Sequence, residues 1–151
     1  MDILEGLNQH QREAVETVEG PLLILAGPGS GKTRVITHRI AYLVQTVGVA
    51  PYRIAAVTFT NKAAREMRER LAGLMGPRSE KVVAGTFHAF CAMVLRREGQ
   101  NLGLDRNFSI YDDTDQLSLI KRCMNEVEIN PKQFSPRALL TAISGAKSQL
   151  I

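Results

Sequence analysis

The chain has 151 residues, of which 44% are hydrophobic and 23% are charged, and its formal net charge is +4. This is enough for one packed domain and the beginning of a second. No stretch approaches the roughly 20 apolar residues of a membrane span, and the first residues lack the basic and apolar regions of a signal peptide. We therefore expect a globular, cytoplasmic protein with no membrane partner.

The elements expected in the first part of the chain alternate between helix and strand. We expect helices over 9–18, from Gly31 to about Gly48, and from Asn61 to Gly76, where Asn8 with Gln11 caps the first helix and Asn61 caps the third. We expect strands over 21–26, 54–60 and 81–86, each placed between or after these helices. Short apolar strands separated by amphipathic helices predict an α/β fold, with a parallel sheet covered on both faces. Ligands of such sheets bind at the carboxyl ends of the strands.

The pattern becomes helical after about residue 90. We expect a helix near Phe90, a helix that starts at Asp113 with Gln116 as its capping partner, and a helix after Ser135. The sequence therefore predicts a division into an α/β part, residues 1–90, and a helical part, residues 91–151.

Positive charge is concentrated in the middle of the chain. Residues 51–100 contain 9 Lys or Arg and 4 Asp or Glu, whereas the flanking segments are close to balanced. Such a segment suits a polyanionic partner such as nucleic acid. The alternative is a solvated helix face that pairs of opposite charge would partly neutralise, namely Lys62 with Glu66, Arg65 with Glu69 and Glu66 with Arg70. Charge alone does not decide between them.

A phosphate-binding loop follows the first predicted strand. The pattern G-x-x-x-x-G-K-[ST] is matched except at its first position, where alanine replaces glycine. Backbone amides hold the phosphates in such loops, the lysine reaches the β and γ oxygens, and the hydroxyl binds Mg²⁺. A plain glycine-rich turn would not explain the lysine and threonine. We expect Mg·ATP to bind the loop, with Lys32 and Thr33 as catalytic residues and Thr33 as the metal ligand; the loop residues are Ala26, Gly27, Pro28, Gly29, Ser30, Gly31, Lys32 and Thr33.

A phosphate-loop ATPase also needs an acidic residue at the end of a second buried strand. The one similar segment is 108–113, but Ser109 interrupts its apolar run, and the helix that follows explains its acids. We therefore expect no such acidic strand in this chain.

Four ordered segments resemble the Q motif and motifs I, Ia and Ib of UvrD/Rep/PcrA-type superfamily 1 DNA helicases. They are LNQHQREAV at 7–15, AGPGSGKTR at 26–34, AVTFTNKAAREM at 56–67 and GTFH at 85–88. The resemblance implies the first part of a RecA-like ATPase domain, called 1A, followed by the start of a helical subdomain, called 1B. The acidic strand and the second motor domain would lie outside this sequence.

The resemblance also implies roles for single residues near the nucleotide. Gln11 would recognise adenine, since an amide both donates and accepts on a base edge; the alternative is that Gln11 only caps the helix with Asn8. Arg34 would lie near the base and phosphates, and the alternative is an exposed arginine in the first turn of the helix.

Motifs Ia and Ib contact single-stranded DNA in the family. An aromatic ring stacks on any base, so these residue types suit binding without sequence preference. For Phe59 the alternative is a core position in the strand. The implied DNA-binding residues are Phe59, Thr60, Asn61, Lys62, Thr86, Phe87 and His88.

The resemblance implies the ATP-binding part of an ATP-dependent helicase that moves 3′ to 5′ on single-stranded DNA, in repair or replication. Its partners would be single-stranded DNA and the remainder of the motor, without which we expect the chain to be inactive. Two alternatives remain: a stand-alone, nucleotide-dependent DNA-binding module without catalysis, and a small P-loop kinase, for which the sequence shows no acceptor site or lid.

Overall fold

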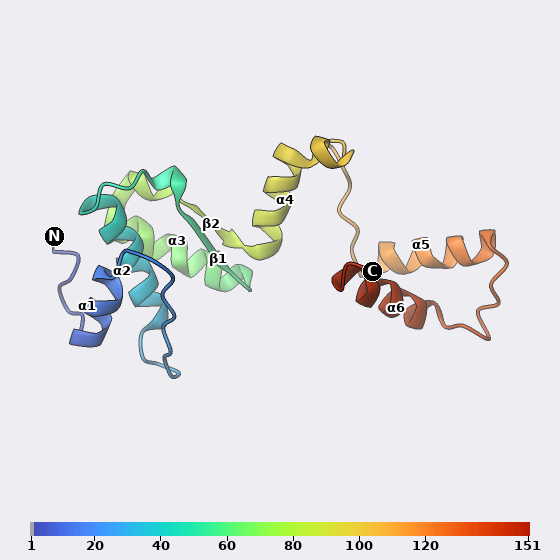
Figure 1. Ribbon diagram of the computed structural model, residues 1–151, viewed down its shortest axis with the longest axis horizontal. Coiled ribbons are helices and arrows are strands. Elements are labelled where there is room, and N and C mark those ends of the chain that lie inside the picture. The colour runs from blue at the N-terminus through green and yellow to red at the C-terminus, as the bar shows by residue number, and fades with distance from the viewer. Residues whose placement is uncertain (1) are drawn as a thin grey trace. The chain divides into compact units, whose positions relative to one another are not determined.

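The computed structural model describes residues 2–151, and the chain divides into two compact units, residues 1–106 and 107–151 (Figure 1). The division lies beyond the predicted boundary at residue 90. Helix α4 (Phe87–Glu98) packs against both strands of the first unit and therefore stays with it. The two units are described separately.

The first unit combines helices with a small parallel sheet. Strand β1 (Ala55–Thr58) pairs with β2 (Val83–Thr86), with Ala55 opposite Val83 and Thr58 opposite Thr86. The other elements are α1 (Gln9–Glu16), α2 (Lys32–Gln45), α3 (Asn61–Met75), α4 and three 3-10 turns, η1 (Pro51–Arg53), η2 (Gly76–Lys81) and η3 (Gly99–Leu102). A mixed α/β unit with parallel strands is thus confirmed.

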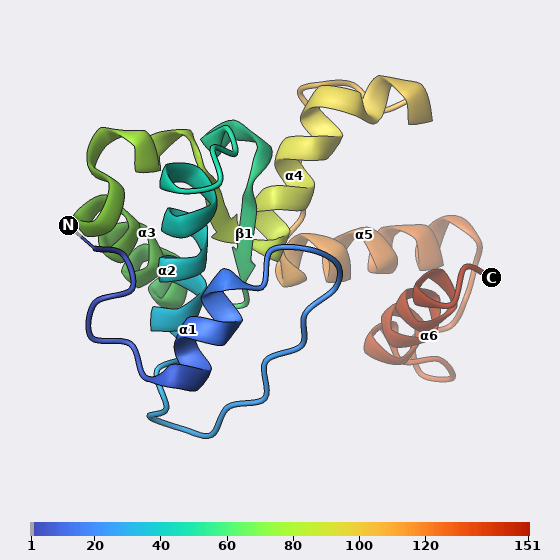
Figure 2. The same ribbon diagram turned by 60° about the vertical axis from the view of Figure 1, so that its left-hand side comes forward.

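Helices α2 and α3 form the main core with β1. Leu71 of α3 is fully buried, and Gln45 of α2 donates a 2.9 Å hydrogen bond to the carbonyl of Leu74. Figure 2 shows α1 beside α2, where Arg39 donates to the carbonyls of Ala14 and Thr17. The buried core residues are Ile3, Ile40, Ala41, Val44, Ala56, Met67, Leu71, Met75 and Val82.

The strand predicted over 21–26 is wrong: this segment forms no strand. The side chains of Leu23 and Leu25 are 80% and 87% exposed, while Ile24 between them packs against a second apolar cluster, Leu7, Val15 and Val35. A strand exists only when a neighbour completes its hydrogen bonds, and β1 and β2 are the sole strands within residues 2–151. The apolar run is present, but no strand of residues 2–151 pairs with it.

Several helix starts differ from the predicted ones. The Asn8 and Gln11 capping box is confirmed, but α1 ends at Glu16. Helix α3 is capped by Thr60 rather than Asn61, because Thr60 is still extended and its hydroxyl accepts from the Ala63 amide at 3.1 Å. Helix α4 begins at Phe87, before the expected Phe90, because Thr86 caps it directly at the end of β2.

The second unit contains two packed helices, α5 (Asp113–Glu126) and α6 (Pro136–Ser148). The α5 cap is Asp112 with Asp115, one residue before the predicted pair Asp113 and Gln116. The Asp112 carboxylate accepts from the amides of Thr114 and Asp115, both at 2.8 Å. Across residues 2–151, no helix is both long enough and apolar enough to cross a membrane.

A buried leucine of α3 and an exposed leucine of the segment 21–26 test which residues form the core. Leu71→Ala removes a fully buried side chain and leaves a cavity, so we expect the free energy of unfolding to fall by about 2–5 kcal/mol. Leu23→Ala, at a position that is 80% exposed, is the matched control and is expected to change it by less than about 0.5 kcal/mol. Urea unfolding followed by circular dichroism measures both, and equal losses would contradict the described core.

Candidate functional site

The phosphate-loop residues form an open turn at the start of α2. Gly29 and Gly31 have φ angles of +74° and +87°, in the left-handed region that glycine tolerates. A Cβ at Gly31 would lie 3.0 Å from the Nε2 of Gln11, so the position also lacks room for a side chain. Gly31 is the N-cap of α2 and provides no side-chain hydrogen bond, and the first turn contains no acidic residue. The first amides of α2 and its positive end are therefore free for an anion.

The side chain of Lys32 folds back onto the first residues of this loop. Its Nζ donates to the carbonyl oxygens of Ala26 at 3.0 Å and Gly27 at 2.6 Å. The Ser30 hydroxyl donates to the same Gly27 carbonyl at 2.7 Å and closes the turn. The backbone thus holds a single cation over the loop, in reach of phosphate oxygens.

A hollow of about 320 Å³ opens beside the loop. It is lined by Gly29, Gly31, Lys32, Thr33 and, from α3, Arg70. The sequence reasoning missed Arg70, which it treated only as a partner for Glu66. The signal was its spacing: Arg70 follows buried Met67 by three residues and so borders the packed face of α3.

The ion pairs expected along α3 do not form. His10 with Glu13, Arg97 with Glu98, and Arg122 with Glu126 form ion pairs, and none of these residues belongs to α3. The cations of α3 are therefore exposed without an acidic partner on the same helix, and the choice between a nucleic-acid surface and a solvated face stays a prediction.

Gln11 connects α1 to the phosphate loop. Its Oε1 accepts from the Asn8 amide at 3.1 Å, and its Nε2 donates to the Ser30 carbonyl at 3.0 Å. The capping interpretation is therefore confirmed, and the same side chain also positions the loop. Recognition of adenine stays a prediction. Adenine recognition is compatible with the bonds to Asn8 and Ser30, because the Gln11 amide has a second donor hydrogen and a second acceptor lone pair.

Arg34 points toward the segment before α1. Its Nη2 lies 2.7 Å from where a Cβ at Gly6 would be, and Gly6 has a φ of +71°. Gly6 thus leaves room for the guanidinium. The role of Arg34 near the base and phosphates stays a prediction.

Two aromatic rings lie just beyond the paired strands. Phe59 follows β1 and Phe87 follows β2, and their ring centroids are 5.3 Å apart with the planes tilted by 44°. Phe59 is 87% exposed, so the alternative of a core position is wrong. The parallel pairing of Thr58 with Thr86 brings both rings to the carboxyl edge of the sheet.

The other predicted DNA-binding residues surround these rings in different ways. Asn61, Lys62 and His88 are exposed in the first turns of α3 and α4, which contain no acidic residue. The hydroxyls of Thr60 and Thr86 are engaged as helix caps, and Thr86 is buried. This edge therefore presents two aromatic faces beside two positive helix ends.

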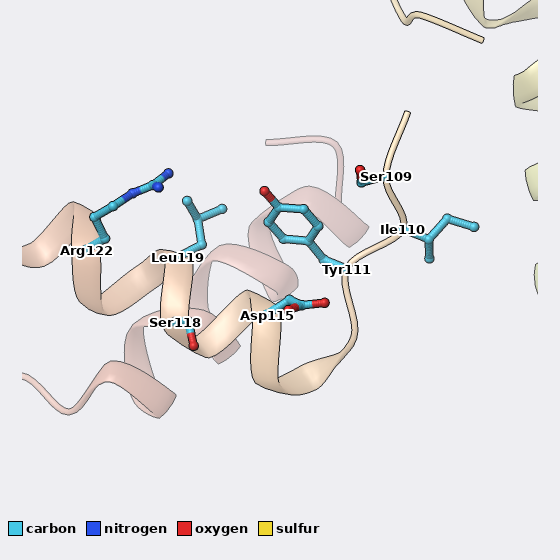
Figure 3. A pocket seen from close by; sticks show the side chains of 7 residues that line it. All are labelled: Ser109, Ile110, Tyr111, Asp115, Ser118, Leu119 and Arg122. Carbon is cyan, nitrogen blue, oxygen red and sulfur yellow. The ribbon is translucent and has the colours of Figure 1, made fainter. Parts of the chain in front are cut away.

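Another hollow, of about 370 Å³, lies in the second unit beside α5 (Figure 3). Its two charged side chains are engaged locally: the Asp115 carboxylate accepts from the Asp112 amide, and Arg122 pairs with Glu126 at 3.8 Å. The segment 108–111, considered above for an acidic strand, is irregular here. Within residues 2–151 no three His, Cys, Asp or Glu side chains are grouped to hold a metal ion. We assign no chemistry to this hollow.

The matching family model and the similar proteins agree on one family. The model of the UvrD/REP helicase N-terminal domain matches residues 7–151. Among curated relatives, the chain is 54% identical over 148 residues to the ATP-dependent DNA helicase PcrA of Bacillus subtilis and 52% identical over the same length to that of Staphylococcus aureus. Each alignment covers 98% of this chain but 20% of the relative, so the chain spans about a fifth of their length.

The Gln11 contacts generate a stability prediction. Gln11→Ala removes the side-chain half of the capping box and the bond to Ser30, and we expect the free energy of unfolding to fall by about 1 kcal/mol. The control is Gln9→Ala in the same helix, which removes one exposed bond to Glu13 and is expected to cost less than about 0.5 kcal/mol. Urea unfolding of the two variants tests this, and indistinguishable midpoints would count against the link.

Proposed function

The chain belongs to the UvrD/REP helicase N-terminal domain family, and we propose that it is the N-terminal ATP-binding part of an ATP-dependent DNA helicase. The helicase would act on single-stranded DNA in the 3′ to 5′ direction, in the cytoplasm, in repair or replication. The observation that supports this most is the loop at Gly31, which leaves the first amides of α2 open and places Lys32 above them.

Mg·ATP is the proposed ligand of the loop. The amides of 29–33 would hold the phosphates, and the Lys32 ammonium would exchange its two carbonyl partners for phosphate oxygens. The Thr33 hydroxyl is an oxygen donor of the kind Mg²⁺ prefers, and the ion's remaining ligands would be phosphate and water. The metal, when bound, would neutralise charge on the phosphates. Gln11 and Arg34 would contact the base side of the nucleotide.

The sheet of this unit would be completed by strands outside residues 1–151, giving a RecA-like ATPase domain. Leu23 and Leu25 of the segment 21–26 are 80% and 87% exposed. An apolar hollow of about 360 Å³, lined by Leu22, Ile24, Lys32, Ile36 and Arg39, lies between that segment and α2. The chain spans 20% of its relatives, so the remainder of such a protein would provide the further strands. The first compact unit would then be part of subdomain 1A and the second part of 1B, with the boundary near residue 106 in place of residue 90.

Single-stranded DNA would bind at the carboxyl edge of β1 and β2. Phe59 and Phe87 offer stacking faces, and the first turns of α3 and α4, with Asn61, Lys62 and His88, suit phosphate contacts. Thr60 and Thr86 would act here by fixing those helix starts. Neither stacking nor phosphate contact reads base identity, so the proposed binding is independent of sequence.

Hydrolysis would need more than this chain. Lys32 and Thr33 position and neutralise the terminal phosphates, but they do not orient the attacking water. A water-orienting carboxylate and an arginine finger, the latter worth roughly 10³–10⁵ in rate, would come from the remainder of the motor. The chain by itself is therefore proposed to bind nucleotide without useful turnover.

The lysine gives the first test of nucleotide binding. Lys32→Ala removes the cation above the loop, so we expect Mg·ATP to bind at least about tenfold more weakly in calorimetric titration. Lys121→Ala, an exposed lysine in α5, is the matched control and is expected to bind as the parent does. Unchanged affinity in Lys32→Ala would refute the proposed nucleotide site.

The exposed ring of Phe59 gives the test of DNA binding. Phe59→Ala is expected to weaken single-stranded DNA binding by on the order of 1–3 kcal/mol because a stacking face is lost. Its melting temperature should hardly change, since the ring is 87% exposed. Fluorescence anisotropy measures the affinity, with Tyr52→Ala, another exposed aromatic of the first unit, as control. Equal affinity in the two variants would remove Phe59 from the DNA surface.

A further inference from the structure

Arg70 is a cation of α3 whose side chain lines the hollow beside the phosphate loop. It is the one lining residue of that hollow that the loop itself does not provide. Long side chains of a helix lean toward its N-terminus. The guanidinium therefore leans toward the end of α3 that follows β1, and Figure 2 shows α2 and α3 packed side by side.

The guanidinium of Arg70 has no hydrogen bond or ion pair with any residue of 2–151. Three other cations of α2 and α3 are engaged. Lys32 is held by two carbonyls, Arg39 donates to Ala14 and Thr17, and Arg68 of the same helix donates to the Ala84 carbonyl at 3.1 Å. Arg70 is thus a cation at this hollow with all its donors unused.

An arginine fork matches the oxygens of a phosphate group, to which it can donate two parallel hydrogen bonds. The loop residues that share the hollow are those expected near the end of the triphosphate, since Lys32 reaches the β and γ oxygens and Thr33 the metal between them. A cation on the α3 side of this hollow would face the outer phosphates rather than the base.

We propose that Arg70 is a phosphate-binding residue, whose guanidinium donates to the terminal phosphate of the nucleotide held by the loop. This inference rests on the proposed function, because it needs Mg·ATP in the loop. It adds a phosphate ligand from outside the loop motif, provided by the helix that begins at the proposed DNA-binding edge.

The test uses calorimetric titration of the 151-residue chain with Mg·ATP and Mg·ADP. Arg70→Ala is expected to weaken Mg·ATP by about tenfold and Mg·ADP by much less, because ADP lacks the terminal phosphate. Arg70→Lys keeps the charge and the stem but loses the fork, so it should fall between Arg70→Ala and the parent. Arg65→Ala, an exposed arginine of α3 that does not line the hollow, should bind both nucleotides as the parent does.

Parent-like Mg·ATP affinity in Arg70→Ala would overturn the proposal, as would equal losses for the two nucleotides. Melting curves show whether each variant folds, and Arg70→Lys carries the test should the alanine variant be unstable. Failure of the proposed function has a different signature: Lys32→Ala would then bind Mg·ATP as tightly as the parent, or the parent would not bind it, and either result would overturn the Arg70 assignment too.

Discussion

The left-handed backbone at Gly31 is the constraint on which the candidate site depends. At φ +87° the chain turns from the loop directly into α2, and a side chain at this position would meet Gln11 at 3.0 Å. An L-residue there would cost roughly 1–2 kcal/mol in backbone strain, before any clash. The turn leaves the first amides of α2 without a side-chain cap, and Gln11 fixes it from α1 through the Ser30 carbonyl. One conformation thus determines both the direction of α2 and the exposure of its amides.

Other helices of the chain show how first-turn amides are satisfied when no ligand is expected. In α5 the Asp112 carboxylate takes the amides of two residues, and Asp113 and Asp115 add negative charge to the first turn. Helices α3 and α4 are intermediate, because a threonine caps each of them but neither first turn contains an acid. Helix α6 also begins without a side-chain cap or an acid, so the left-handed glycine turn and the position of Lys32 are what distinguish the start of α2.

Sequence reasoning succeeded where the determinants are local. The glycine turn before α2, the Asn8 and Gln11 box and the parallel strands near 55–58 and 83–86 all follow from short patterns. Choosing Asn61 over Thr60 as a cap failed because both residue types cap well, and the end of β1 decided which one is extended. The strand over 21–26 failed for a different reason, since its pattern is right but a strand's hydrogen bonds come from a neighbour that local sequence cannot provide.

Tertiary packing explains what the sequence missed. Arg70 reaches the loop hollow only because α3 packs beside α2, and the exposure of Phe59 depends on β1 ending at Thr58. Neither fact is visible in sequence spacing: charge spacing offered Arg70 as a partner for Glu66, and the strand pattern left a core position open for Phe59.

The most direct test of the central claim, that the loop before α2 binds phosphates through its backbone, is amide hydrogen exchange read by NMR with and without Mg·ATP. We expect the amides of 29–33 to become protected on addition of Mg·ATP, while those in the first turn of α5, already bonded to Asp112, stay unchanged. Exchange in 29–33 that does not respond to saturating Mg·ATP would contradict the account.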